Sequence, residues 1–207
     1  MTDDNMRWRL INWGLTLIAT VAATAVMAQS GRERDSRFIV RIGDEAPTFQ
    51  FVTNEGDTID SDMLRGQVVV LQFAASWCPF SQAQLVDHQK RIWERYRHGG
   101  NFAMYVICED SEADRSIFIA QRKENGIDIP YTFDSDECLY RLFVTPKGSV
   151  TRTVVISPEW RIAELHDIHT WRDMSEIRRC VRKLSKLNSK FAGKKQKEAA
   201  NSKIWRL

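Results

Sequence analysis

One run of apolar residues constrains the fold of this chain more than any other feature. Residues 68–75 read Val-Val-Val-Leu-Gln-Phe-Ala-Ala, which is typical of a strand buried on both faces of a sheet. The run breaks at Ser76, and a helical pattern follows in which Leu85, Ile92 and Tyr96 fall on one stripe. A buried strand that leads directly into an amphipathic helix predicts an α/β fold.

The rest of the chain alternates between strand and helix patterns in the same way. Short apolar runs predict further strands, and segments with apolar residues three or four positions apart predict helices. The predicted strands are 102–108, 131–133, 153–156 and 161–165, the last two forming a hairpin, and the predicted helices are 114–125, 136–143 and 173–187. This order predicts a mixed central β-sheet with helices on both faces.

The N-terminal residues read as an export signal. Two arginines precede an uncharged stretch at 10–28 that closes on small residues, as a signal peptide does before its cleavage site. The stretch is also long enough to cross a bilayer, so the alternative for residues 1–28 is an N-terminal membrane anchor. Residues 29–40 are predicted to form a linker, and residues 41–184 are predicted to form the folded domain. Either interpretation of the leader places that domain in the periplasm or cell envelope.

The positive charge of the chain is concentrated at its C-terminal end. The whole chain carries a net charge of +3, but residues 183–207 hold eight Lys or Arg and one Glu, which leaves −4 for the rest. A mildly acidic body argues against a nucleic-acid partner. Residues 185–207 predict a basic, disordered tail that could contact an anionic membrane surface, as could an uncleaved leader.

Cys78 is the candidate reactive group. It stands at the predicted junction of strand and helix, where the first N–H groups of the helix are unpaired and the helix dipole is positive. Because a thiolate is an anion, a cysteine at this position has a lowered pKa and is more nucleophilic near neutral pH. Pro79 suits the first helical turn, which does not need its missing N–H, and Trp77 supplies an apolar wall. An oxidising compartment outside the cytoplasm favours redox chemistry at such a thiol.

Residues 73–81, Phe-Ala-Ala-Ser-Trp-Cys-Pro-Phe-Ser, resemble the F-W-A-T-W-C-P-P-C segment of exported thioredoxin-like proteins of the TlpA/ResA type, within the wider redoxin and AhpC/TSA group. Residues 43–49 resemble the family's opening G-x-x-A-P-x-F, and 154–162 resemble its F-L-I-D-x-x-G-x-I segment. The resemblance covers about 41–183. It implies a thioredoxin-like fold, thiol–disulfide oxidoreductase or antioxidant activity, disulfides or thiols of proteins or small molecules as partners, and no cofactor.

Two departures from the family pattern bear on the mechanism. Ser81 stands where the family has its second cysteine, so the partner that releases a mixed disulfide is missing. The resemblance then implies a monothiol mechanism, with Cys78 as nucleophile and Ser81 as a hydrogen-bond donor to the thiolate. The family's cis-proline falls near 150–151, where this chain has no proline. The predicted substrate-contacting residues are Trp77, Pro79, Val150, Thr151 and Arg152, the last either facing the thiolate or solvated at a strand end.

Another cysteine could serve as the resolving partner of Cys78. Cys108 ends the strand predicted to lie beside the motif strand, so both could open on the same rim of the sheet. Cys138 lies at the start of a predicted short helix, and Cys180 on the closing helix is expected to be core or half-buried. The sequence does not decide between Cys108 and Cys138, because a disulfide requires Cα atoms within about 7 Å of each other.

Two other functions compete with the oxidoreductase. A non-catalytic thioredoxin-fold module would bind partner chains along the Val150–Thr151 edge. A thiol peroxidase-like antioxidant protein of the peroxiredoxin type would need a proline at position 71 and Thr or Ser at position 75. Leu71 and Ala75 occupy those positions, which disfavours that chemistry.

No metal site is predicted. His166 and His169 lie close in sequence with Asp167 between them, but no third ligand at a suitable spacing accompanies them. The acidic segments 109–114 and 134–137 lack the spacing of a calcium loop and are predicted to be exposed turns.

Overall fold

The computed structural model describes residues 38–146, 148–167 and 170–204. The predicted leader at 1–28 and most of the predicted linker at 29–40 lie outside these residues. Within the described ranges, no helix is both long and apolar enough to cross a bilayer.

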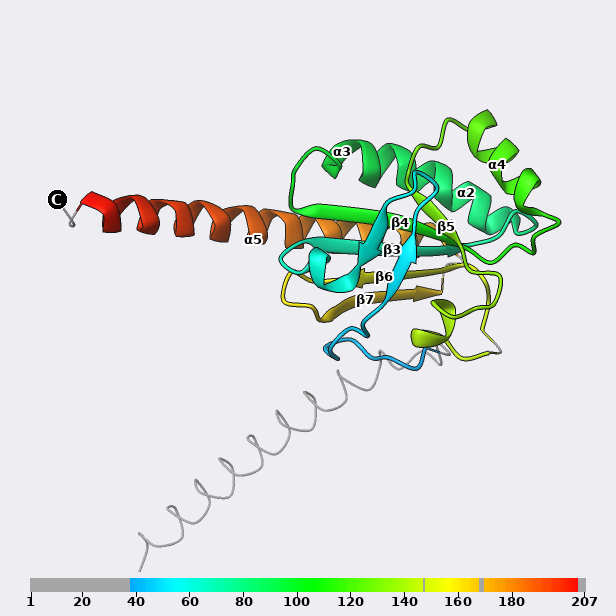
Figure 1. Cartoon of the computed structure of the whole chain (residues 1–207), viewed down its shortest axis with the longest axis horizontal. Coiled ribbons are helices and arrows are strands. Elements are labelled where there is room, and N and C mark those ends of the chain that lie inside the picture. Colours follow the sequence, from blue (N-terminus) through cyan, green and yellow to red (C-terminus); the bar gives the residue numbers. More distant parts are fainter. Residues whose placement is uncertain (1–37, 147, 168–169, 205–207) are drawn as a thin grey trace, which may run out of the picture. The chain divides into compact units, whose positions relative to one another are not determined.

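A five-stranded mixed sheet forms the centre of the fold (Figure 1). Its strands, in spatial order, are β5 (Tyr131–Phe133), β4 (Phe102–Cys108), β3 (Val68–Ala74), β6 (Arg152–Ile156) and β7 (Ile162–Asp167). Strands β3, β4 and β5 are parallel, whereas β6 is antiparallel to both β3 and β7. Every residue of β3 is buried, as its continuously apolar sequence predicts.

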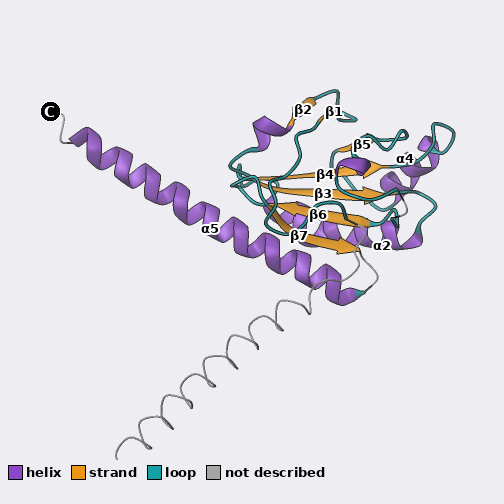
Figure 2. Ribbon diagram, turned by 90° about the horizontal axis from the view of Figure 1, so that it is seen from below, coloured by secondary structure: helices purple, strands orange, loops and turns teal. Residues whose placement is uncertain are grey.

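The α-helices share one hydrophobic core with one face of this sheet. They are α2 (Pro79–His88), which continues through the π-helical turn η2 (Gln89–Trp93) into α3 (Glu94–Tyr96), then α4 (Arg115–Glu124) and α5 (Trp171–Ile204). Leu85 of α2, Phe118 of α4 and Ile177 of α5 belong to this core and are fully buried. Figure 2 shows α5 lying along β7.

The second face of the sheet is covered by smaller elements. The hairpin of β1 (Gln50–Val52) and β2 (Thr58–Asp60) lies there together with the 3-10 helices η1 (Ser61–Leu64) and η3 (Tyr140–Leu142). A separate core forms on this side around the buried Trp160. The predicted mixed sheet with helices on both faces is therefore confirmed, with α-helices on one face and 3-10 turns on the other.

Two predicted helices differ in length from the observed ones. The segment predicted as a helix over 136–143 contains only η3, because Asp134 accepts hydrogen bonds from the amides of Leu139 and Tyr140 and fixes a short turn there. The closing helix is longer than predicted, since α5 continues to Ile204 through the segment expected to be a disordered tail. Residues 185–204 contain no proline, one glycine and many good helix formers, which accounts for this correction. The domain boundaries themselves stay a prediction.

Candidate functional site

The structure places Cys78 where strand β3 passes into helix α2. Cys78 is the N-cap residue of α2, with an extended backbone (φ −98°, ψ 110°), and Pro79 is the first helical residue. The Cys78 side chain is half-buried. The thiol therefore lies at the positive end of the helix dipole while remaining accessible.

A threonine at the start of the neighbouring strand contacts this thiol. Strand β6 pairs with β3 so that Arg152 lies opposite Phe73, which brings the preceding residue, Thr151, to the end of β3. Thr151 Oγ1 lies 3.1 Å from Cys78 Sγ and 2.7 Å from Ser81 Oγ. The three side chains form a short hydrogen-bonded chain in which Thr151 stands between the sulfur and the serine.

The backbone sets the direction of the hydrogen bonds in this chain when the sulfur is ionised. The amide of Ala75 donates to Ser81 Oγ over 3.4 Å. Ser81 then donates its own proton to Thr151 Oγ1, and Thr151 donates to the Cys78 thiolate, since a thiolate only accepts. The contact expected from Ser81 is thus made chiefly by Thr151, whose hydroxyl Ser81 orients.

The surroundings of Cys78 favour the thiolate. Burial raises the pKa of the Cys78 thiol, but hydrogen bonds from the Thr151 hydroxyl, which Ser81 orients, and from the Ser81 and Phe80 amides outweigh it, and the net pKa is lowered. Hydrogen bonds to the charged form account for this direction. The arrangement provides a nucleophilic sulfur near neutral pH.

Exposed apolar side chains lie next to the thiol in sequence. Trp77 is 67% and Phe80 is 58% exposed, and Pro79 between them is also exposed. Val150, which was predicted to contact substrate, is buried. Thr151 is also buried, and its hydroxyl contacts the Cys78 sulfur. Phe80 was not predicted as a site residue, although its position beside Cys78 in the motif was the available signal. Large exposed apolar side chains are typical of a contact surface for a partner.

Arg152 has a structural role that neither sequence interpretation anticipated. It is 1% exposed, so it is not solvated, and its guanidinium forms an ion pair with Asp167 at 2.8 Å. Its Nε also donates to the carbonyl of Ser149, and the guanidinium lies over the ring of Phe38. The arginine therefore links the start of β6 to the end of β7.

The other three cysteines are free thiols in environments that disfavour the thiolate. Cys108 pairs with Ala74 in the β3–β4 register, as predicted for neighbouring strands, but it is fully buried and burial raises its pKa far above the usual value. Cys180 is half-buried, as expected, and burial raises its pKa to about 12. Burial of this kind counts against Cys108 as a resolving thiol, which stays a prediction.

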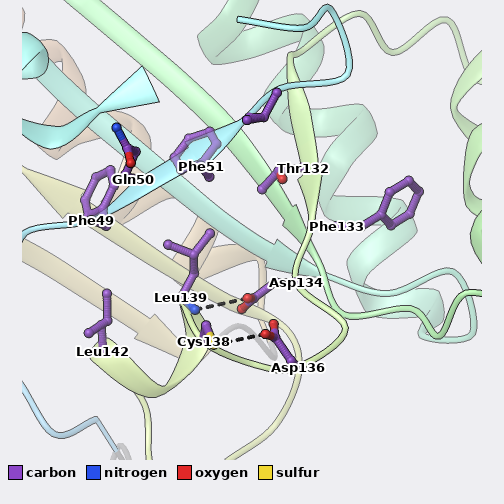
Figure 3. Close-up of a pocket in the computed structure, with 11 residues that line it drawn as sticks. Phe49, Gln50, Phe51, Thr132, Phe133, Asp134, Asp136, Cys138, Leu139 and Leu142 are labelled. Atoms are coloured by element: carbon purple, nitrogen blue, oxygen red, sulfur yellow. Dashed lines mark hydrogen bonds between the residues drawn. The ribbon is translucent and has the colours of Figure 1, made fainter. Parts of the chain in front are cut away.

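Cys138 lies beside a separate pocket between β1, β5 and η3 (Figure 3). The pocket has a volume of about 370 Å³, and Phe49, Phe51 and Leu139 contribute apolar lining. Cys138 is exposed, and its thiol donates to Asp136 Oδ2 over 3.1 Å. This hydrogen bond and the charge of Asp136 raise the pKa of Cys138. A resolving role for Cys138 likewise stays a prediction, and its acidic neighbour counts against it.

A buried carboxylate holds the loop that carries the motif. Asp110 follows β4 and is fully buried, and its Oδ1 accepts a hydrogen bond from the amide of Ser76 at 2.9 Å. Gln121 of α4 donates to the carbonyl of the same Ser76 at 3.3 Å. The prediction of exposed turns was wrong for Asp110 and for the buried Asp134, because each carboxylate accepts backbone hydrogen bonds within the fold.

Beneath α2, three polar side chains form a closed ring of hydrogen bonds. Gln72 donates to Gln84, Gln84 donates to Thr153, and Thr153 donates to Gln72, over 3.1, 2.8 and 2.6 Å. His88 lies beside Gln84 and is fully buried, and burial together with the nearby Arg178 lowers its pKa to about 3. The ring fixes α2, and with it Cys78, to strands β3 and β6.

The sequence matches the AhpC/TSA family over residues 42–165. The chain belongs to this family. It is 26% identical over 157 residues to the thiol-disulfide oxidoreductase ResA of Oceanobacillus iheyensis, covering 72% of this chain and 77% of the relative. The predicted resemblance to thioredoxin-like redoxins is thereby confirmed.

Solved structures share the fold of this AhpC/TSA family member. One is a solution structure described as a protein disulfide isomerase from Bacteroides thetaiotaomicron, with a TM-score of 0.67 and 28% identity, over 72% of this chain and 92% of that one. A yeast mitochondrial 1-Cys peroxiredoxin aligns with a TM-score of 0.56 and 21% identity, over 73% of this chain and 79% of that one. The thioredoxin-like fold predicted from the sequence is confirmed.

Proposed function

We propose that this AhpC/TSA family member is a thiol–disulfide oxidoreductase that uses Cys78 as its single nucleophile. The observation that carries the proposal is the contact of the half-buried Cys78 sulfur with Thr151, backed by Ser81 and the first amides of α2. These groups lower the pKa of the thiol without a second cysteine. The similarity to a relative named as a thiol-disulfide oxidoreductase supports the same activity.

The reaction follows from the chemistry of the thiolate. Cys78 Sγ attacks one sulfur of a substrate disulfide, the substrate S–S bond breaks, and a mixed disulfide forms while the leaving thiolate takes a proton from water. A second thiol, supplied by a small molecule or a partner protein, then attacks the mixed disulfide and returns Cys78 as a thiolate. Ser81 cannot take this second role, since its hydroxyl forms no disulfide. Its part is to orient Thr151.

The exposed side chains of Trp77, Pro79 and Phe80 are the proposed contact surface for the substrate. They flank the nucleophile in sequence and offer apolar area to the residues around a protein disulfide. The buried Val150 and Thr151 supply the backbone on the other side of the sulfur, and Arg152 supports this segment through its pairing with Asp167.

Insulin reduction by dithiothreitol with three forms of the protein tests the proposal. Ser81→Cys restores a dithiol, and we expect its reductase activity to exceed that of the native chain by about tenfold or more, because an internal thiol resolves the mixed disulfide. Cys78→Ala is expected to be inactive. If Ser81→Cys forms no disulfide with Cys78 and gains no activity, the inferred geometry of the site is wrong.

Treatment of the native chain with oxidised glutathione separates catalysis from binding alone. A nucleophilic Cys78 takes up one glutathionyl group, found by mass spectrometry on the peptide that carries Cys78, and releases it to added thiol. A binding module would leave Cys78 unmodified under the same conditions. Hydrogen peroxide in place of oxidised glutathione tests the peroxidase alternative, which predicts oxidation of Cys78 to the sulfenic acid at a rate above that of Cys138.

We infer that the domain acts outside the cytoplasm, with residues 1–28 as its export signal. The Arg-preceded apolar stretch of the leader supports this location. Fractionation of expressing cells and N-terminal sequencing test it. A signal peptide gives a soluble envelope protein that starts near residue 29, an anchor gives an intact membrane-bound chain, and recovery of the intact chain from the cytosol would contradict export.

We also propose contact with an anionic membrane surface, through the basic segment 185–207 or an uncleaved leader, to which a cationic groove of the folded domain would add. A groove of about 660 Å³ between η2, α3 and α5 is lined by six cationic side chains and one acidic one, Glu94. The cations are Lys90, Arg91, Arg95, Arg178, Arg179 and Arg182. Cosedimentation with phosphatidylglycerol vesicles is expected to fall with salt and to weaken on Arg179→Gln and Arg182→Gln, and equal binding to phosphatidylcholine vesicles would refute the contact.

A further inference from the structure

The cationic groove lies between two helical segments that pack firmly on each other. Helix α5 contacts the π-helical turn η2, and Ile92 of η2 and Ile177 and Val181 of α5 are fully buried in one core. This apolar contact fixes the distance between the two segments. The side chains above it, from η2, α3 and α5, therefore form the walls of a preformed groove of about 660 Å³, a volume typical of ligand sites.

The walls of the groove carry more positive charge than their neighbours balance. Six of the lining side chains are cations, whereas Glu94 is the acidic one and Asp87 is a second acid that pairs with lining arginines. The six cations exceed these two acids by four positive charges. Four cations make no hydrogen bond or ion pair with the part of the chain that the structure describes, namely Lys90, Arg95, Arg179 and Arg182.

Like charges also recur along each wall. Arg91 and Arg95 are four residues apart on one wall, and Arg178 and Arg182 are four residues apart on the other. Like-charged side chains at this spacing are neighbours on the helix surface and destabilise the helix. A bound anion would offset this repulsion, so the arrangement favours a negatively charged ligand.

A buried carboxylate holds two of the arginines in place. Asp87 is 8% exposed, and its two oxygens accept hydrogen bonds from Arg91 Nε at 2.8 Å and from Arg178 Nη1 at 2.7 Å. A guanidinium has five N–H donors, so each arginine keeps further donors for a ligand. Because Asp87 already orders these two side chains, they lose little additional freedom when a ligand binds.

The backbone of one wall is also unusual. In η2 the amide of Glu94 donates to the carbonyl of Gln89, five residues earlier. Such π-helical turns are rare and are frequent at functional sites. The reaction at Cys78 does not use this turn, because Cys78 stands about 12 residues earlier in the same helical segment, roughly 18 Å away at a rise of about 1.5 Å per residue. The turn therefore supports a second site at the groove.

We propose that this groove binds an oligophosphate, a group of linked or clustered phosphates that matches the surplus of four positive charges. Guanidinium groups pair with phosphate oxygens through two parallel hydrogen bonds, which favours phosphate over other anions. Soluble oligophosphates and the clustered headgroups of an anionic bilayer both carry this chemistry. The proposal names the group that the groove recognises, beyond the membrane contact proposed above, and it does not depend on the reaction at Cys78.

Calorimetric titration of the full chain with sodium tripolyphosphate at low salt tests this proposal. We expect one tripolyphosphate per chain, bound at least about tenfold more tightly than inorganic phosphate, because the attraction grows with the charge of the ligand. Lys90→Gln and Arg182→Gln remove one cation from each wall, and each should weaken binding by about tenfold. Arg182→Lys keeps the charge without the planar guanidinium, and its affinity should lie between those of the native chain and Arg182→Gln.

Two control variants separate the groove from general electrostatic attraction. Arg41→Gln removes an exposed arginine from the loop before β1, and the double variant Lys194→Gln/Lys195→Gln removes two charges from the basic segment 185–207. Both should leave the affinity within about twofold of the native value. Equal weakening in the groove and control variants, or several tripolyphosphates per chain without preference over inorganic phosphate, would overturn the proposal.

Competition between tripolyphosphate and phosphatidylglycerol vesicles distinguishes the two sources of phosphate. If bound tripolyphosphate releases the chain from vesicles, the groove also accepts lipid phosphates. If it binds without releasing the chain, the ligand is a soluble oligophosphate and another segment contacts the membrane, so either result supports the proposal. Failure of tripolyphosphate to bind would overturn it, even where vesicle binding persists. Insulin reduction should be unchanged in the groove variants, so failure of this proposal and failure of the Cys78 mechanism give different results.

Discussion

The hydroxyl of Thr151 sets the reactivity of Cys78, and replacing it with valine tests this directly. Thr151→Val keeps the shape of the side chain and removes the hydrogen bond of 3.1 Å to the sulfur. A hydrogen bond to a charged group contributes about 1.5–3 kcal/mol, and the half-buried position of Cys78 favours the lower figure. Because one pKa unit corresponds to about 1.36 kcal/mol, the pKa of Cys78 should rise by about 1 unit.

The reaction rate should respond in two opposite ways. The thiolate fraction at neutral pH falls by about tenfold, while the more basic thiolate reacts about threefold faster, given a Brønsted coefficient of about 0.4–0.5. Alkylation at neutral pH should therefore slow by about three- to fourfold, and the plateau rate at high pH should increase by about threefold.

Alkylation with iodoacetamide over a range of pH, followed by mass spectrometry of the peptide that carries Cys78, measures both effects. Peptide resolution is needed because Cys138 is also exposed. Thr151→Ser keeps the hydroxyl and should retain most of the native pH profile. Thr132→Val is the control, since it makes the same chemical change at a buried threonine of β5. An unchanged midpoint in Thr151→Val, or an equal rise in Thr151→Ser, would refute the assigned role.

Two further variants test the packing around the site. Asp167→Asn removes the negative charge that pairs with the buried guanidinium of Arg152 and should cost about 2–3 kcal/mol of unfolding free energy in urea, whereas Glu137→Gln, at the exposed pair with Arg141, should cost less than about 1 kcal/mol. Similar losses in the two variants would contradict the burial argument. The pKa of His88 is lowered to about 3, below its unfolded value of about 6.5, so the stability that depends on its neutral form is present above pH 6.5 and is lost as the pH falls. Between pH 7 and pH 5 the free energy of unfolding of the native chain should fall by about 2 kcal/mol because of this group, and His88→Gln should remove that part of the fall. If the free energies of unfolding of the two proteins change in parallel with pH, the lowered pKa of His88 is wrong.

The outline of the fold could be predicted from local patterns. Each of three elements is recognisable from a short stretch of sequence: the buried run at 68–75, the helix that follows it and the hairpin near the end. The length of the closing helix was underestimated, because a polar helix has no apolar stripe to mark it and only its composition favours helix. The length of the helix predicted over 136–143 was overestimated. Asp134 limits it to the short turn η3 through hydrogen bonds that hydrophobic periodicity does not reveal.

The candidate site was predicted less completely. Cys78 and Ser81 were predicted as site residues from the motif, since both belong to one helical turn. Thr151 was predicted only as a substrate contact, and its hydrogen bond to the Cys78 sulfur was not predicted, because the two residues are 73 positions apart in the sequence. Asp110 was assigned to an exposed turn for the same reason, since it meets the amide of Ser76 from 34 positions away.

The amino-acid sequence by itself determined that a cysteine would begin a helix directly after a buried strand, because strand period, helix start and cap chemistry are properties of neighbouring residues. Only the tertiary structure decided which groups face that sulfur and which cations meet in the groove beside α5. Those neighbours depend on the pairing of β6 with β3 and on the packing of α5 against η2, and both are set by the packing of the whole domain.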